Sequence, residues 1–299
     1  MPLTQYFETI ARQTEDWLDR LVPPENAYPP SIHQAMRYSL FAGGKRMRPM
    51  LAVAAYDAAG SHGPRDTVMP FAAALEIIHT YTLIHDDLPA LDNDELRRGK
   101  PTCHVKFGED TAILAGDALL TLAFRILADR ELFAGAPVET VCDLARETAE
   151  AIGSLGTIGG QVVDLEYENA TEPDPAALEY IHTHKTGKLI ALAAMGGGML
   201  GGAREDQLRA LTEYGRHVGL AFQIIDDILD VEGDEKLLGK KTGADTRMEK
   251  MTYPSLAGMK ASKEKAVDLI DRAIAELEMF GEAGAPLADL ARYVAARSL

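Results

Sequence analysis

The sequence predicts an all-α protein, and three observations support this prediction. Apolar residues recur at spacings of three and four along most of the 299 residues, which is the periodicity of amphipathic helices. Alternating runs of β-branched residues, which would indicate strands, are missing. Hydrophobic residues make up 46% of the chain, with only 6% aromatic residues, so a large aliphatic core is available to a bundle of helices.

In the first half of the chain, proline and glycine mark the ends of the predicted helices. Pro23-Pro24 stops the first helix, and Gly43-Gly44 follows the second. We expect helices over residues 3–21, from Tyr28-Pro29-Pro30-Ser31 to Phe41, over 48–60, from about Asp66 to Asp86, over 109–133 and over 137–152. Gly116 in the fifth of these allows a close approach to a neighbouring helix.

In the second half, glycine-rich segments interrupt the helical pattern. The segment 153–160 is glycine-rich, so we expect a helix to resume at Gln161. A helix from Ala176 should kink at Lys185-Thr186-Gly187-Lys188, because glycine weakens a helix interior, and should end at Gly196-Gly197-Gly198 and Gly201-Gly202. Further helices are expected over 204–232, from Tyr253 to about Phe280 and from Pro286 onward, with loops at 171–175 and 239–245. Because no linker-like break in composition occurs, we predict one domain over residues 1–299.

Composition excludes several classes of partner. The formal net charge of −16 argues against nucleic acid and against an anionic membrane surface, because both attract basic proteins. Cys103 and Cys142 are too few and too widely spaced for a disulfide framework or a zinc site. The N-terminus lacks the features of a signal peptide, and no apolar run is expected to reach membrane-spanning length. A cytoplasmic protein without stable membrane association is therefore expected.

The first acidic cluster follows the apolar helix that ends near Asp86. Asp86, Asp87, Asp92 and Asp94 fall within nine residues. In a regular helix Asp92 would lie about 240° around the axis from Asp86. Pro89 breaks the helix, since it has no N–H and its ring clashes with the preceding turn, and this break allows Asp92 to turn back toward Asp86. The alternative is a helix end followed by a plain acidic loop.

The second acidic cluster lies late in the long helix over 204–232. Asp226 and Asp230 share one helix face, and Asp227 lies about 100° away. Gln223 precedes Asp226 by about one turn. Carboxylates at this spacing repel one another, so both clusters need a strongly cationic partner.

Short basic segments accompany these clusters. They are Lys45-Arg46-Met47-Arg48 after the glycine pair, Arg97-Arg98, Lys185 with Lys188, and Lys240-Lys241. Exposed basic turns and surface ion pairs are the alternative interpretation. Mg²⁺ binds one or two carboxylates together with phosphates, and arginine grips phosphate oxygens in pairs. With no nucleotide-binding glycine motif present, the pattern favours a diphosphate that carries a hydrocarbon tail.

Taken together, these motifs resemble the trans-isoprenyl diphosphate synthases, most closely the bacterial farnesyl diphosphate synthases. The matching stretches are Gly43 to Pro49, Asp86 to Asp92 with Arg97-Arg98-Gly99, Lys185-Thr186-Gly187 and Phe222 to Asp230. The resemblance implies the all-α isoprenoid synthase fold, a single large bundle with a central cavity, and a homodimer. It implies condensation of isopentenyl diphosphate with an allylic diphosphate (dimethylallyl or geranyl) by ionisation, condensation and elimination.

The resemblance also implies roles for individual residues. Three Mg²⁺ ions, or Mn²⁺ in their place, would lie between the allylic diphosphate and Asp86, Asp92 and Asp226, supported by Asp87, Asp227 and Asp230. The allylic diphosphate would be held by Arg97, Lys185, Thr186, Gln223, Lys240 or Lys241, and Lys250. Isopentenyl diphosphate would be held by Gly44, Lys45, Arg48, His79 and Arg98. The residues with catalytic roles would be Asp86, Asp92, Asp226, Lys185 and Arg97.

Chain length is the finer question that the resemblance raises. In similar bacterial enzymes an aromatic residue at the position of Tyr81 limits the product to the farnesyl chain, and the small Thr82 leaves room beside it. Tyr81 as an ordinary core residue is the alternative. A geranyl or geranylgeranyl diphosphate synthase is the nearest alternative function, and a helical protein that binds divalent cations without catalysis is the alternative from another class. A terpene cyclase is disfavoured, because the second cluster is rich in aspartate.

Overall fold

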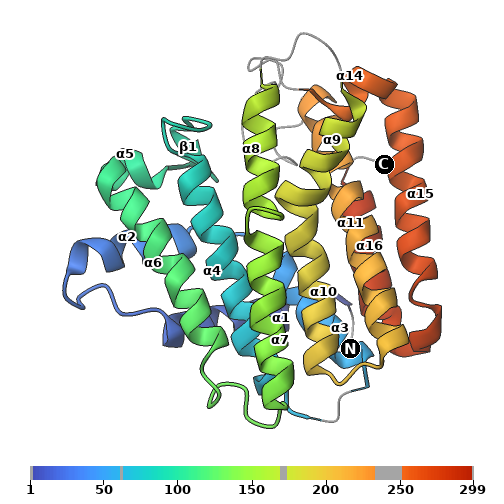
Figure 1. Cartoon of the computed structure of the whole chain (residues 1–299), viewed down its shortest axis with the longest axis horizontal. Coiled ribbons are helices and arrows are strands. Elements are labelled where there is room, and N and C mark those ends of the chain that lie inside the picture. The colour runs from blue at the N-terminus through green and yellow to red at the C-terminus, as the bar shows by residue number, and fades with distance from the viewer. Residues whose placement is uncertain (1–2, 61–62, 169–173, 233–250, 298–299) are drawn as a thin grey trace. The chain divides into compact units, whose positions relative to one another are not determined.

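The computed structural model describes residues 3–60, 63–168, 174–232 and 251–297 (Figure 1). Helices dominate the described residues, which confirms the all-α prediction. The described strands are β1 (Leu96–Arg97) and β2 (Lys100–Pro101), a short antiparallel pair that the sequence analysis did not predict. The chain forms two compact units, residues 1–53 with 63–145 and residues 54–62 with 146–299. That residues 1–299 form one domain stays a prediction.

The first unit contains the N-terminal helices and the strand pair. Its elements are α1 (Leu3–Leu21), α2 (Pro30–Leu40), the first part of α3 (Met47–Ala58), a 3-10 turn (Arg65–Thr67), α4 (Met69–Asp86), β1, β2, α5 (Cys103–Phe107), α6 (Glu109–Leu127) and the first part of α7 (Val138–Ile152). Apart from α5, which was not predicted, these bounds agree with the predicted helices to within a few residues. The main difference is α6, which ends at Leu127 instead of continuing to residue 133.

Helix α4 is the core helix of this unit. By length and composition, residues 65–86 could cross a membrane, with a mean hydropathy of 1.3, but 83% of that window is buried inside the protein. The expectation that no apolar run reaches membrane-spanning length is therefore wrong for this segment. Burial explains its composition, because a helix covered on all sides is apolar on all sides.

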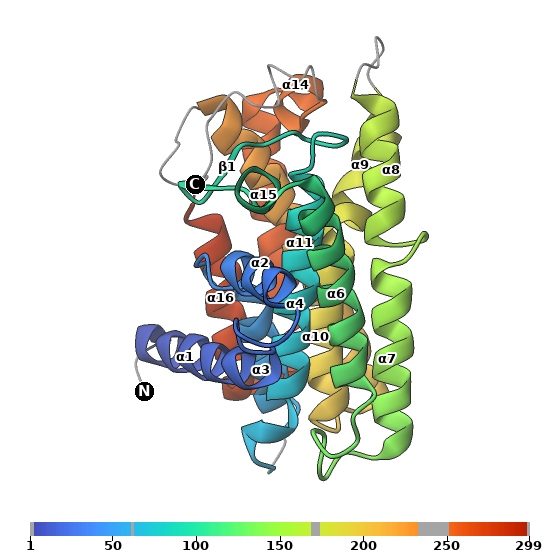
Figure 2. The same cartoon turned by 90° about the vertical axis from the view of Figure 1, so that its left-hand side faces the viewer.

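Helices α4 and α6 pack side by side, as Figures 1 and 2 both show. Gly116 of α6 faces His85 of α4, and a Cβ added at Gly116 would lie 2.1 Å from Nε2 of His85. This contact confirms the close approach predicted at Gly116. The His85 ring also lies 3.0 Å from the carbonyl oxygen of Ile113. The packing therefore fixes the C-terminal end of α4, where the first acidic cluster begins.

The second unit contains the remaining helices. Its elements are residues 54–58 of α3, the end of α7, α8 (Thr157–Tyr167), α9 (Pro175–Ile181), a π-helical turn (His182–Gly187), α10 (Lys188–Leu200), α11 (Glu205–Glu232), α14 (Tyr253–Ala257), α15 (Met259–Ala275), a 3-10 segment (Glu278–Gly284) and α16 (Ala285–Ala295). The predicted loop at 239–245 and most of the one at 171–175 lie outside the described residues.

Glycines in this unit serve helix packing more than helix termination. Helix α8 begins at Thr157, before the predicted start at Gln161, and it includes Gly160. Helix α10 continues through the glycine triplet to Leu200, because these glycines are buried against α11. A Cβ added at Gly198 would lie 2.4 Å from Cδ1 of Leu211. The prediction that Gly196-Gly197-Gly198 end the helix is therefore wrong, because tertiary contacts favour small residues within it, whereas Gly201-Gly202 do follow its end at Leu200 as predicted.

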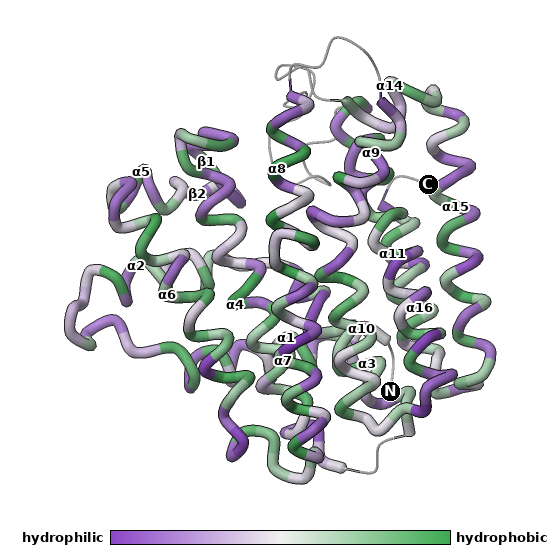
Figure 3. The backbone as a smooth tube through the Cα atoms, viewed as in Figure 1, coloured by the Kyte–Doolittle hydropathy of each residue, from purple (hydrophilic) through white to green (hydrophobic). Residues whose placement is uncertain are grey.

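The C-terminal helices are shorter than predicted. The expected helix from Tyr253 to Phe280 divides into α14 and α15 at Gly258, where φ is +82°, a conformation that glycine adopts readily. Helix α15 is amphipathic and shows alternating hydrophobic and hydrophilic stretches along the tube in Figure 3. Its apolar face, with Ala266 and Leu269, is buried, and α15 packs on α11. This packing supports the helix that carries the second acidic cluster.

Candidate active site

The first acidic cluster forms a closed turn at the end of α4. Helix α4 ends at Asp86, and the N–H of Asp92 donates to the carbonyl oxygen of Asp86 at 2.9 Å. The N–H of Asn93 donates to the carbonyl oxygen of Leu88 at 3.1 Å, with a φ of +52° at Asn93. The chain after Pro89 therefore folds back on the helix end. This geometry confirms the prediction that Asp92 returns to Asp86.

Asp87 is held by Arg97 from the strand pair. Nε of Arg97 donates to both carboxylate oxygens of Asp87 at 2.8 and 2.9 Å, and Nη2 donates to Oδ1 at 2.5 Å. Burial raises the pKa of Asp87, and the bonds to Arg97 oppose that rise. The Arg97 guanidinium also lies 3.7 Å from Asp94. Arg97 thus connects the acidic turn to β1. Arg97 also interacts electrostatically with the predicted ligand Asp86, and Asp87 with Asp92.

The glycine pair at residues 43 and 44 meets Arg98 in the same unit. Nη1 of Arg98 donates to the carbonyl oxygen of Gly43. A Cβ added at Gly44 would lie 2.9 Å from Nη1 of Arg98, and φ at Gly44 is +138°. The backbone conformation at residue 44 favours glycine, because side chains rarely adopt a φ in this range. The structure therefore brings together two motifs that are far apart in the sequence.

His79 lies on α4 near several of these cations. Burial, followed by the charges of Arg48 and Arg98, lowers the pKa of His79 well below its ordinary value. The imidazole is therefore neutral at pH 7, with one N–H to donate. Lys45 is exposed. The first unit thus brings the charges of Arg48 and Arg98 close to His79, and the binding of isopentenyl diphosphate by these residues and Lys45 stays a prediction.

Arg46 has a structural role, unlike the neighbouring cations. It is 3% exposed, and its guanidinium lies 2.7 Å from a carboxylate oxygen of Glu15 and 2.8 Å from one of Glu76. Nη2 donates to the carbonyl oxygen of Leu40 at 2.8 Å. The sequence interpretation of three cations beside a glycine pair is therefore corrected, because Arg46 is used inside the protein.

A small pocket lies beside the strand pair. Thr80, Asp87, Arg97 and Arg98 are among its lining residues. Tyr81 does not line this pocket. It is 5% exposed, and its hydroxyl has no hydrogen-bond partner among the described residues.

Burial, followed by the charge of Asp86, raises the pKa of Tyr81 to about 12. The hydroxyl of Thr82, the second residue predicted to set chain length, donates to the carbonyl oxygen of His79 at 2.8 Å. Both residues lie on the last turns of α4 before Asp86, and their role in setting chain length stays a prediction.

In the second unit, α11 carries the second acidic cluster. Asp230 is 2% exposed, while 29% of the Asp226 side chain is exposed. Oδ1 of Asp226 lies 2.7 Å from Nη1 of Arg297, whose guanidinium also lies over the ring of Phe222 at 4.7 Å. Gln223 is partly buried on the same helix. Sequence reasoning missed Arg297, because nothing in the local pattern near the C-terminus connects it to α11.

Asp227, the next residue on α11, contacts Tyr253 and His182. Its Oδ2 accepts the N–H of Tyr253 at 2.8 Å and lies 3.4 Å from Nε2 of His182. Burial lowers the pKa of His182 to about 4, so the ring is neutral at pH 7. Sequence reasoning missed His182 as well, although its place three residues before Lys185 was a signal.

Lys185 and Thr186 lie on the π-helical turn, which confirms the predicted irregularity there. Nζ of Lys185 donates to Oδ2 of Asp164 on α8 at 2.7 Å. A Cβ added at Gly160 would lie 2.2 Å from the backbone nitrogen of Lys185. Glycine therefore lets α8 lie directly against the turn. Lys240, Lys241 and Lys250, also predicted for the diphosphate, lie outside the described residues.

Comparison with known proteins assigns the family. The family model described as polyprenyl synthetase matches residues 29–280. This chain belongs to the polyprenyl synthetase family. The polyprenyl synthetases are prenyltransferases, and the match extends over residues of both units.

Individual relatives cover most of this polyprenyl synthetase. A dimethylallyltranstransferase of Fischerella ambigua is 46% identical, over 91% of this chain and 78% of that protein. A geranylgeranyl diphosphate synthase of Cyanophora paradoxa is 43% identical, over 95% of this chain and 93% of that protein. A solved FPP/GFPP synthase from Zymomonas mobilis has a TM-score of 0.88 and 37% identity, with 98% of each chain covered. These comparisons confirm the predicted fold.

The donor set of this polyprenyl synthetase fits Mg²⁺. The described residues contain no group of three His, Cys, Asp or Glu side chains arranged to hold a metal by themselves. Mg²⁺ does not need one, because it takes carboxylate oxygens together with phosphates and water. Asp86 and Asp92, whose backbones are joined by a hydrogen bond in the first unit, carry carboxylate oxygens, which are the hard donors that this ion prefers.

Proposed function

We propose that this polyprenyl synthetase condenses isopentenyl diphosphate head-to-tail with dimethylallyl or geranyl diphosphate, and that farnesyl diphosphate is its product. The observation that carries the proposal is the backbone bond from Asp92 to Asp86, which sets two carboxylates at one helix end beside Arg97. Such an arrangement suits a metal-bound diphosphate better than it suits a solvated acidic loop. The family match supports the same reaction class.

The proposed roles follow from the chemistry of the side chains. Bound Mg²⁺ would stabilise the negative charge that develops on the leaving diphosphate. Asp86, Asp92 and Asp226 would hold the metal ions, with Asp87, Asp227 and Asp230 in support. Arg97, Lys185 and Thr186 would bind and orient the allylic diphosphate. In the first unit, Arg98 and Arg48 would bind isopentenyl diphosphate beside His79. The positive charges of these arginines disfavour a protonated His79, so its ring stays neutral.

No side-chain nucleophile is required for this reaction. The allylic C–O bond breaks, its electron pair leaves with the diphosphate, and the double bond of isopentenyl diphosphate forms the new C–C bond. The proton lost in the elimination goes to the released diphosphate. The test is incubation with Mg²⁺, isopentenyl diphosphate and a series of allylic diphosphates, with products sized by chromatography. Failure to form any prenyl diphosphate would contradict the proposal.

Replacing Tyr81 with alanine is expected to shift the products toward longer chains. Tyr81 is buried five residues before Asp86, and removing its ring opens space on the helix that leads away from the diphosphate end. Product chromatography measures the shift. Tyr293→Ala is the control, because Tyr293 is 45% exposed on α16. An unchanged product spectrum in Tyr81→Ala would show that Tyr81 is an ordinary core residue.

A geranylgeranyl product is the second candidate, and the names of relatives favour it. The Cyanophora paradoxa protein and a protein of Catharanthus roseus, 47% identical over 90% of this chain, are named as geranylgeranyl synthases. Among solved structures, one from Marinomonas sp. MED121, 39% identical, is named as a farnesyl-diphosphate synthase. The same chromatography of the wild-type products separates the two candidates.

The remaining expectations are tested in solution. A cation-storage protein would bind Mg²⁺ without diphosphate, whereas the proposed enzyme needs both for tight binding. Isothermal titration with and without inorganic pyrophosphate distinguishes them. We also propose a homodimer in the cytoplasm without stable membrane association, and light scattering of the purified protein tests the dimer.

A further inference from the structure

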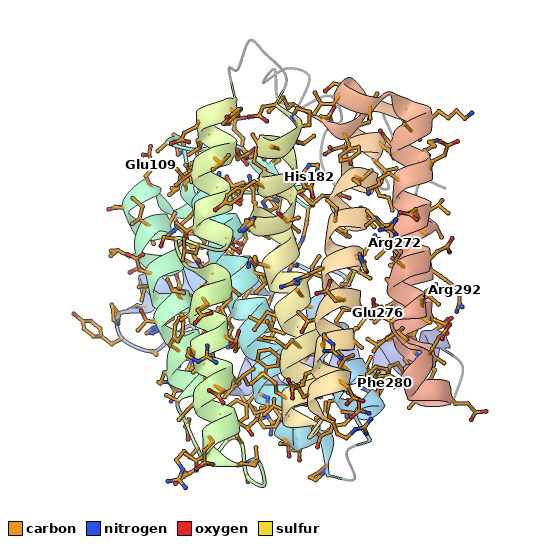
Figure 4. The ribbon with its side chains drawn as sticks, turned by 45° about the vertical axis from the view of Figure 1, so that its right-hand side comes forward. Glu109, His182, Arg272, Glu276, Phe280 and Arg292 are labelled. Carbon is orange, nitrogen blue, oxygen red and sulfur yellow. The ribbon has the colours of Figure 1, made fainter. Side chains whose placement is uncertain are left out.

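His182 is a buried polar residue to which the proposed reaction assigns no role. It is 4% exposed, and it begins the π-helical turn between α9 and α10 (Figure 4). Its Nδ1 atom is buried without a hydrogen-bond partner in the described part of the chain. Burying a polar atom in this way costs free energy. We therefore expect the other ring nitrogen, Nε2, to make an interaction that offsets the cost of burying Nδ1.

The other nitrogen, Nε2, faces Asp227 of α11. It lies 3.4 Å from Oδ2 of Asp227, and the same oxygen accepts the backbone N–H of Tyr253 at 2.8 Å. The His182 and Tyr253 rings are nearly parallel, with an interplanar angle of 19° and centroids 6.2 Å apart. An N–H on Nε2 would be directed at this carboxylate oxygen. The π-helical turn, α11 and α14 thus converge on one carboxylate.

The π-helical turn itself is held on two further sides. Gly160 of α8 lies against the backbone of Lys185, and a Cβ added at Gly219 of α11 would lie 2.8 Å from Cα of Gly187. Helix interruptions of this π type are rare and often occur at functional sites. Because the turn cannot move without displacing these neighbours, its contact with Asp227 links Lys185 to the acidic face of α11.

We infer that His182 is a positioning residue that acts through Asp227 to hold the second acidic cluster in register with the diphosphate-binding turn. Polar groups behind metal ligands orient them in this way. Asp227 is adjacent in sequence to Asp226, so fixing the side chain of Asp227 fixes the rotation of α11 that presents Asp226 and Asp230. This inference rests on the proposed function of the same site.

The test measures binding of Mg²⁺ with inorganic pyrophosphate by isothermal titration, alongside thermal melting of each variant. His182→Leu removes the donor at similar volume, and we expect the Mg²⁺ concentration for half-maximal pyrophosphate binding to rise by about 10- to 100-fold. His184→Leu is the matched control. His184 lies on the same turn, but its ring stacks on Tyr180 with centroids 3.8 Å apart, so its loss should leave pyrophosphate binding unchanged.

Two polar variants separate positioning from packing. Glutamine carries its amide N–H near the place of Nε2, so His182→Gln should stay within about threefold of the wild type, since it keeps an N–H directed at Asp227. Asparagine is too short, so His182→Asn should bind as weakly as His182→Leu. Comparing His182→Gln with His182→Asn still tests the inference if His182→Leu fails to fold. Equal binding by His182→Gln and His182→Asn would overturn the inference.

A double-mutant cycle shows whether His182 acts through Asp227. Asp227→Asn alone should weaken binding, and combining it with His182→Leu should add little, because contacting residues are not additive. Additive effects would contradict the inference, as would a His182→Leu protein that melts earlier but binds normally. Those results would leave the proposed function intact. If the wild-type protein neither binds Mg²⁺-pyrophosphate nor forms product, the proposed function fails, and this inference fails with it.

Discussion

Asp86→Ala is expected to lower kcat by about 10²- to 10³-fold, the usual cost of removing one group that stabilises developing charge. Asp86 ends α4, and its carbonyl oxygen receives the N–H of Asp92. The substitution keeps this backbone bond, so the turn should persist while one carboxylate is lost. Steady-state kinetics with geranyl and isopentenyl diphosphates at saturating Mg²⁺ measures the effect.

The controls for this prediction separate loss of a ligand from loss of structure. Asp268→Ala removes an aspartate whose side chain is 46% exposed on α15 and pairs with Arg272, so its activity should stay near wild type. Asp86→Glu keeps the carboxylate at a different reach and should retain more activity than Asp86→Ala. Near-normal kcat in a folded Asp86→Ala protein would contradict the assignment of Asp86 as a metal ligand.

Arg46→Met is expected to lower the free energy of unfolding by about 3–5 kcal/mol, because it leaves a buried carboxylate uncompensated. The side chains of Arg46 and Glu76 are 2% and 3% exposed, and their charged atoms lie 2.8 Å apart. The substitution keeps much of the side-chain volume, so the loss reports on charge more than on packing. Urea unfolding followed by circular dichroism gives the difference.

Two comparisons make the Arg46 prediction specific. Arg146→Met breaks an ion pair with Glu150 in which both side chains are more than half exposed, and such pairs contribute at most about 1 kcal/mol. The double variant Arg46→Met with Glu76→Leu should be more stable than Arg46→Met alone, because no buried charge is left opposite the methionine. If Arg46→Met and Arg146→Met cost the same, Arg46 does not stabilise the first unit in the way its burial indicates.

Much of the fold and the first acidic turn could be predicted from local sequence. The apolar period of α1 predicted its observed bounds at residues 3–21, since one helix face must be buried whatever it packs against. Pro89 predicted the return of Asp92, because a missing N–H and a steric clash act within a few residues. The irregularity at Lys185 was predicted from the neighbouring Gly187, because glycine weakens a helix interior, which is also a local effect.

The tertiary structure alone decided which charged side chains face inward. Lys45 and Arg46 are neighbours in the sequence, yet Lys45 is exposed and Arg46 pairs with Glu76 inside the first unit. The contact of Arg297 with Asp226 and that of His182 with Asp227 join segments that carry no shared local pattern. Helical periodicity and proline act over a few neighbouring residues, so the sequence by itself determined the helices and the acidic turn. Ion pairs and buried polar contacts depend on which distant segments meet, so only the folded chain determined the partners of its charges.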